Sequence, residues 1–100
     1  MIVSFRDSGT EAIFDGTIAN KKARRSLPMN LWKIAQRKFT VMAGTLDLDD
    51  LKVPPNNHLE ALEDDREGQH SIRINDQYRI CFVWTEQGPT EVEVVDYHKG

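Results

Sequence analysis

The chain has 100 residues, of which 39% are hydrophobic and 29% are charged; this composition is typical of one globular domain and excludes an intrinsically disordered chain. The formal net charge of −3 assigns no partner by itself. The opening "MIVSFRD" is too short for a signal peptide, and no apolar run approaches the roughly 20 residues of a transmembrane helix, so we expect a cytoplasmic protein without membrane contact. Cys81 is the single cysteine, which excludes an internal disulfide. The Cys and His spacing predicts no metal site, and we expect no cofactor.

The first half of the chain reads as a short strand followed by helices. A strand is predicted over residues 2–5 (IVSF), then a helix over 8–15 that Ser8 or Thr10 caps and Gly16 ends. Pro28 suits the first turn of a longer helix. Its apolar stripe follows helical spacing: Leu31, Ala35, Phe39, Met42 and Leu46. The stretch KVPPNN at 52–57 then ends the helical region.

The second half changes to a period of two, which is typical of strands. HLEALED at 58–64 is a strand or an extended lead-in. Residues 70–74 and 78–84 predict a hairpin, because the turn-forming Asn75-Asp76 separates them. A last strand follows the turn EQGP and covers 90–98. This order predicts one α+β domain over 1–100, with an N-terminal strand and helices packed on one face of a twisted antiparallel sheet.

Basic residues gather in one part of the chain. Residues 16–46 contain no acidic residue, yet they hold seven of the thirteen basic ones: Lys21, Lys22, Arg24, Arg25, Lys33, Arg37 and Lys38. A local cationic surface on an acidic protein fits binding to a polyanion or to an acidic partner protein. A solvated helix face is the alternative.

Five side chains in the C-terminal half could carry phosphate chemistry. Arg73 and Arg79 lie on neighbouring strands, and an Arg fork matches phosphate oxygens. Asp96, Tyr97 and His98 follow near the end, where a His can exchange protons at neutral pH and a Tyr can stack on a base. Together these are the parts that a metal-free ribonuclease needs, although strand arginines and terminal histidines are also common surface residues. Strand alternation separates Tyr97 from His98, so a bulge or a curled terminus would have to bring them into one pocket.

The run GQHSIRINDQYRICFVW followed by VEVVDYH resembles the HigB-type killer proteins of bacterial toxin–antitoxin modules, within the RelE/ParE superfamily. The resemblance extends to IVSF, the central helix and PPNNHLEALEDDREG, and therefore spans nearly the whole chain. Such proteins are compact α+β ribonucleases that enter the ribosomal A site and cut mRNA during translation. A helix-turn-helix antitoxin of the HigA type holds them inactive. The implied partners are thus this antitoxin, the ribosome and mRNA, with operator DNA contacted only through the antitoxin complex.

The resemblance also assigns roles to residues. His98 and Tyr97 match the terminal pair at the scissile phosphate, His98 as general acid or base and Tyr97 as the group that orients the substrate. Asp96 matches the acidic residue before them and would tune His98. Arg79 matches the strand arginine that stabilises the phosphate, and Arg73 would share that task. The seven basic residues would contact ribosomal RNA, where every phosphate neutralised makes binding more salt-dependent.

One stretch departs from the pattern of the better-known nucleases. They carry a His and a Lys in a motif like LHPLKGDR, whereas this chain has LEALEDDR, with Glu60 and Glu63 at those positions and Asp64 in place of the Gly. Glu60 could act as a general base, and His58 lies two residues away; a solvated strand edge is the alternative. Because Glu63 adds a negative charge beside a phosphate site, we expect a weaker toxin or a different placement of the RNA.

Two other functions stay open. A gyrase-poisoning toxin of the same superfamily would act by binding protein, but the DYH ending argues against that branch. A catalytically silent protein that only binds its antitoxin is the second alternative, and the LEALEDDR departure favours it.

Overall fold

The structure, a computed structural model, describes residues 1–97. Three α-helices come first: α1 (Ser8–Asp15), α2 (Lys21–Ser26) and α3 (Trp32–Gly44). Short 3₁₀ helices connect or extend the elements: η1 (Met29–Leu31), η2 (Leu48–Lys52), η3 (Pro55–Asn57) and η4 (Asp64–Arg66). The strands follow: β1 (Glu60–Ala61), β2 (His70–Arg73), β3 (Tyr78–Thr85) and β4 (Gly88–Asp96). No helix in this part of the chain is long and apolar enough to cross a membrane.

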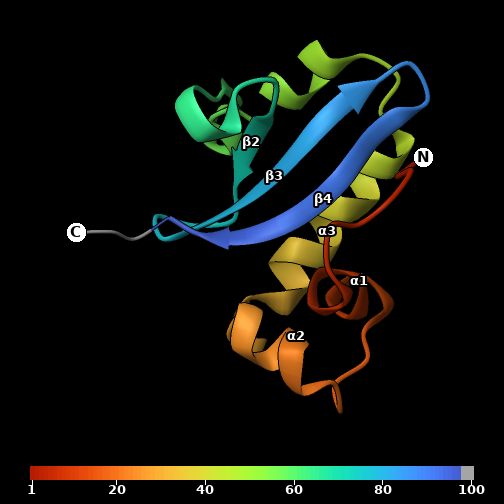
Figure 1. Cartoon of the computed structure of the whole chain (residues 1–100), viewed down its shortest axis with the longest axis vertical. Coiled ribbons are helices and arrows are strands. Elements are labelled where there is room, and N and C mark those ends of the chain that lie inside the picture. The colour runs from red at the N-terminus through yellow and green to blue at the C-terminus, as the bar shows by residue number, and fades with distance from the viewer. Residues whose placement is uncertain (98–100) are drawn as a thin grey trace.

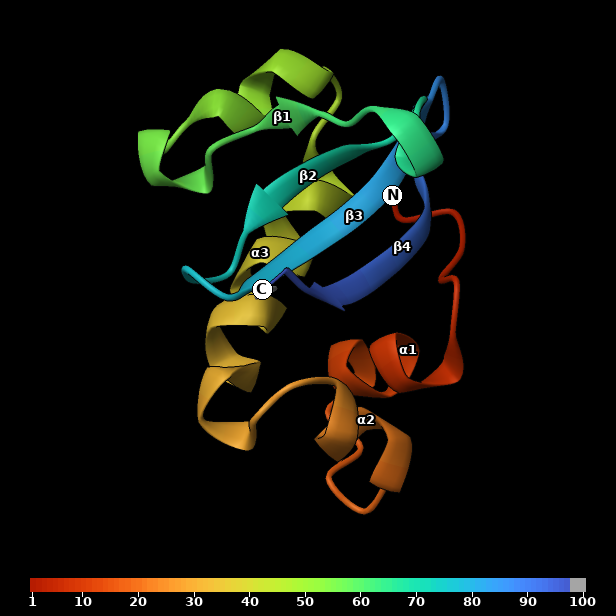
Figure 2. The ribbon, with the colours of Figure 1, turned by 60° about the vertical axis from the view of Figure 1, so that its left-hand side comes forward.

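The four strands form one antiparallel sheet in the order β1-β2-β3-β4. In the register, Ile72 of β2 pairs with Ile80 of β3, which pairs with Val94 of β4. All three are buried, so this row faces the helices. Helix α3 crosses behind the sheet, α1 and α2 lie below it, and the other face is largely uncovered (Figures 1 and 2). The predicted α+β class and the β2–β3 hairpin are confirmed.

The N-terminal segment is extended but does not form the predicted strand at 2–5. Phe5 makes a single parallel bridge to Val92, and the Val3 N–H donates to the Pro89 carbonyl at 2.8 Å. Glu91 has a positive φ of 51°. This conformation bends β4 where the ladder would continue, so pairing stays local.

Helix α1 is capped by a residue other than the predicted Ser8 or Thr10. Asp7 is the N-cap, and its carboxylate accepts from the Thr10 N–H at 2.7 Å; Ser8 and Thr10 lie inside the helix. The predicted stop at Gly16 is confirmed, with φ of 78°. The Thr10 hydroxyl is instead used in the core, where it accepts from the Val94 N–H at 3.0 Å. This bond fastens α1 to β4.

Helix α3 buries most of the predicted stripe. Ala35, Phe39 and Met42 are buried, together with Trp32, and Leu31 is half-buried. Leu46 is 93% exposed, so its assignment to the stripe is wrong. The helix ends at Gly44 and Thr45 is extended, so Leu46 no longer follows the helical spacing.

Candidate active site on the open face of the sheet

Two arginines face each other on the uncovered face of the sheet. Arg73 of β2 is the register partner of Arg79 of β3, and both alternate with the buried isoleucines of the opposite face. Like charges directly opposite each other on a sheet are destabilising unless an anion compensates them. Among residues 1–97, the one ion-pair partner of Arg73 is Asp76, at 3.5 Å and fully exposed. The Nε of each arginine is buried without a hydrogen-bond partner in the described structure.

Arg79 is held between two elements that are distant in sequence. Its Nη1 donates to the Glu60 Oε1 of β1. Its guanidinium carbon lies 4.7 Å from the centroid of the Tyr97 ring, which is a cation–π distance. The side chain of Arg79 is only 11% exposed, whereas that of Glu60 is 54% exposed. The fold therefore brings together Glu60, Arg79 and Tyr97, as well as Arg73 through the strand register.

The end of β4 sets the positions of Asp96 and Tyr97. The Tyr97 N–H donates to the Gln77 carbonyl at 2.6 Å, which extends the pairing beyond the strand and fixes the ring near Arg79. The Asp96 carboxylate accepts from the Gln77 side-chain amide at 3.2 and 3.3 Å. His98 lies outside the described residues, so its predicted role beside Tyr97 remains a prediction.

An acidic hollow of about 430 Å³ adjoins this cluster. It is lined by Glu63, Asp64, Asp65, Arg66, Val95, Asp96 and Tyr97. Three acidic residues of LEALEDDR, Glu63, Asp64 and Asp65, thus lie in the same hollow as Asp96 and Tyr97. Their charge opposes a phosphate in the hollow itself and favours one nearer the arginines.

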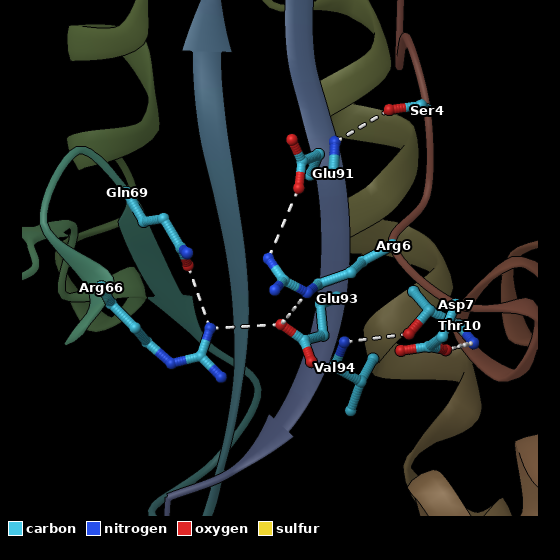
Figure 3. Close-up of polar contacts among 9 residues, drawn as sticks. All are labelled: Ser4, Arg6, Asp7, Thr10, Arg66, Gln69, Glu91, Glu93 and Val94. Carbon is cyan, nitrogen blue, oxygen red and sulfur yellow. Dashed lines mark hydrogen bonds and ion pairs between the residues drawn. The ribbon is translucent and has the colours of Figure 1, made fainter.

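Arg66 is a third arginine in this region, and it was not predicted to belong to the site. Arg66 Nη1 donates to Glu93 Oε1 at 3.1 Å and to Gln69 Oε1 at 3.0 Å (Figure 3). Arg6 approaches the same Glu93 oxygen at 3.9 Å. Partial burial is the largest single influence and lowers the pKa of Arg66, but the hydrogen bond to Glu93 and the attraction of Glu93, Cys81 and Tyr97 together exceed it, so the pKa is raised. Arg66 is therefore a cation held in place by its hydrogen bonds. The four acidic residues around it in EDDRE gave no indication of this role in the sequence.

Three other titratable side chains lie in or near the sheet: Cys81, His58 and His70. Burial raises the pKa of the Cys81 thiol to about 11, so this residue is a neutral core thiol near pH 7. His58 is exposed, and His70 stacks on Phe82 at 6.3 Å between ring centroids. Within residues 1–97, no three His, Cys, Asp or Glu side chains come together as metal ligands.

The predicted basic residues divide into two groups. Those of α2 (Lys21, Lys22, Arg24 and Arg25) are exposed below the sheet, and Lys33 and Arg37 of α3 are also exposed (Figure 2). None of these six has an ion-pair partner among the described residues. Lys38 differs because it is half-buried and donates to Asn57 Oδ1 of η3; burial lowers the pKa of its amine. Lys38 thus fastens α3 to η3.

This architecture is that of the RelE-like toxins, small α+β proteins with helices against an antiparallel sheet. The family model described as the RelE-like toxin of the type II toxin–antitoxin system HigB matches residues 3–98, so the chain belongs to this family. Toxin HigB-1 of Vibrio cholerae serotype O1 is 31% identical over 99 residues, which cover 99% of each chain. An uncharacterized protein of Haemophilus influenzae is 41% identical over 58 residues, 58% of this chain and 57% of that protein. Membership in a type II module gives the chain an antitoxin as partner.

Proposed function

We propose that the chain is a ribosome-dependent endoribonuclease that cuts mRNA without a metal ion and thereby inhibits translation. The observation that carries this proposal is the opposed pair Arg73 and Arg79, each with a buried Nε that lacks a hydrogen-bond partner. A dianionic phosphorane between the two strands would supply both missing acceptors and offset the repulsion between the two cations.

The cleavage step begins with the 2′-hydroxyl of the RNA. Its oxygen attacks the adjacent phosphorus and gives its proton to Glu60, while the bond from phosphorus to the 5′-oxygen breaks. His98 protonates that leaving oxygen, and the products are a 2′,3′-cyclic phosphate and a free 5′-hydroxyl. During this step the Arg79 guanidinium exchanges its hydrogen bond to Glu60 for hydrogen bonds to the phosphate oxygens. The Glu60 carboxylate is then free to accept the proton of the reacting hydroxyl.

Tyr97 and Asp96 would position the reacting groups. The Tyr97 ring already lies against Arg79, so a nucleobase or sugar can pack beside it while the phosphate binds the guanidinium. Asp96 would act electrostatically on His98 from the end of β4. The acidic hollow at Glu63 weakens the attraction for RNA, and we expect slower cleavage than in nucleases with a Lys at this position.

The cations of α2, together with Lys33, would contact ribosomal RNA. They are exposed and lack ion-pair partners in the described structure. Helix α2 lies below the sheet, away from strands β2 and β3 (Figure 2). Phosphate contacts of this kind position a protein without reading sequence. They explain why cleavage would require the ribosome: the ribosome supplies the binding energy that the acidic protein lacks for free RNA.

The test is primer extension on a reporter mRNA incubated with the purified protein, with and without translating ribosomes. We expect cuts only with ribosomes, and 2′,3′-cyclic phosphate at the new 3′ ends. A parallel incubation with DNA gyrase and plasmid serves as the control for the alternative target. Intact mRNA together with broken plasmid would overturn the proposal in favour of a gyrase toxin, and intact RNA and DNA would favour a protein that only binds its antitoxin.

A further inference from the structure

A groove of about 390 Å³ lies on the helix-covered side of the sheet, opposite the face that carries Arg73 and Arg79. Its floor and walls are mainly apolar. They come from α3, from η2 and the residue before η3, and from β2 and the residue just after it: Ile34, Val41, Leu51, Pro54, Ile72 and Ile74. Strand β1 pairs with only His70 and Ser71 of β2. In the described structure, Ile72 of β2 and Ile74 just after it therefore have no neighbouring strand on the β1 side, where they line the groove.

The outer part of the apolar lining is exposed to water, whereas the floor residues Leu51, Ile72 and Ile74 are buried. Val41 contributes to the groove and is 53% exposed. Val53, which precedes the lining residue Pro54, is 69% exposed. Apolar side chains that gather at a hollow and remain exposed are characteristic of interaction sites rather than of an inert surface.

The border of the groove is positive. Arg37 is exposed and has no ion-pair partner in the part of the chain that the structure describes, and the Lys38 amine lies beside it on the same helix, held by Asn57. No acidic residue occurs between residues 16 and 46, so α3 carries no carboxylate to compensate them. The complementary ligand has apolar side chains for the floor and a carboxylate for Arg37. RNA would use the cations but would leave the apolar floor empty.

We propose that this groove is the docking surface for the antitoxin, which seats an acidic amphipathic segment in it. Apolar side chains of that segment pack on Ile34 and Val41, and an Asp or Glu pairs with Arg37. The proposal depends on membership in the toxin–antitoxin family and not on the cleavage reaction. It can therefore fail while the nuclease proposal stands, and the reverse also holds.

The test measures the affinity between the purified chain and the antitoxin of its own module by isothermal titration calorimetry, in the absence of RNA. Two variants probe the groove, Arg37→Glu and Val41→Asp; both positions are exposed, so the fold should tolerate them. Arg25→Glu on α2 is the matched charge reversal outside the groove. We expect each groove variant to raise Kd by about tenfold or more, because a buried anchor contact is lost. Arg25→Glu should leave Kd within about twofold, and Arg37→Lys should recover most of the affinity.

Unchanged Kd in both groove variants, with native circular dichroism, would overturn the proposal. An equal loss in Arg25→Glu would also overturn it, because the effect would then reflect net charge alone. If Arg37→Glu weakened binding to ribosomes and left antitoxin affinity intact, Arg37 would be an RNA contact and the groove would not be the antitoxin site.

Discussion

Arg79 shows how much a single side chain depends on its surroundings. It is 11% exposed, bonded to Glu60 and stacked against Tyr97, so its guanidinium is oriented before any ligand arrives. An oriented fork loses little conformational entropy when it binds a phosphate. A Lys at this position would keep the charge but could not make the same planar contacts with both the carboxylate and the ring.

Glu60 could act as a general base, or it could only hold Arg79 in place, and the Glu60→Gln variant distinguishes these two roles. Glu60→Gln keeps an acceptor for the Arg79 Nη1 but cannot take a proton from the 2′-hydroxyl. We expect single-turnover cleavage on the ribosome to fall by roughly 10²–10⁴-fold, the usual contribution of a general base, with unchanged circular dichroism. Cleavage at or above the wild-type rate would show that Glu60 only competes with the phosphate for Arg79.

Strand alternation and the Asn75-Asp76 turn were sufficient to predict that Arg73 and Arg79 lie on neighbouring strands, which the register of β2 and β3 confirms. The contact between Glu60 and Arg79 was not predictable, because the register of β1 against β2 is set by the irregular segment between Ala61 and His70. Arg66 belongs to that same segment. A side chain in an irregular turn has no periodicity from which its direction can be read.

At the scale of elements, the bond between Thr10 and Val94 ties the helices to the strand that carries Asp96. Thr10→Val preserves the side-chain volume but leaves the buried Val94 N–H without its acceptor. We expect a loss of about 1–3 kcal/mol in the free energy of unfolding, measured by urea denaturation. Thr40→Val is the control, because the exposed Thr40 hydroxyl donates to the Gln36 carbonyl of its own helix and has no other hydrogen bond within the described part of the chain. Equal losses in the two variants would contradict the special role of Thr10.

The elements with strong periodicity were predicted correctly, and those fixed by tertiary contacts were not. The β2–β3 hairpin combines alternation with a turn signal, and the apolar stripe located α3. The prediction that Pro28 lies in the first turn of this helix is wrong, because Pro28 is not helical and α3 begins at Trp32 after η1. Helix α2 has only the buried Ala23 facing the core and depends on the Asn20 cap. The segment at 2–5 has strand-like residues but meets β4 at its bend, so its sequence preference is overridden.

The whole molecule carries three separate surfaces of different character, which the net charge of −3 does not reveal. The arginine pair occupies the open face of the sheet, and the apolar groove lies on the helix side. Helix α2, which carries exposed cations, lies below the sheet (Figures 1 and 2). The proposed substrate chemistry, ribosome attachment and antitoxin binding use different surfaces, so we expect substitutions on one surface to leave the other two activities unchanged. The basic residues and the two strand arginines were visible in the sequence. The groove was not, because it is assembled from segments far apart in the chain.

The most direct test of the central claim compares the rate of ribosome-dependent mRNA cleavage for the wild type, Arg79→Gln and Lys52→Gln. Lys52 is exposed and pairs only with Asp49 in the described structure, so its variant removes one positive charge away from the arginine pair. We predict a loss of about 10²–10³-fold for Arg79→Gln, the effect of removing one donor from a developing oxyanion, and a rate within about twofold of wild type for Lys52→Gln. Equal rates for all three proteins would contradict the assignment of the open face as the active site.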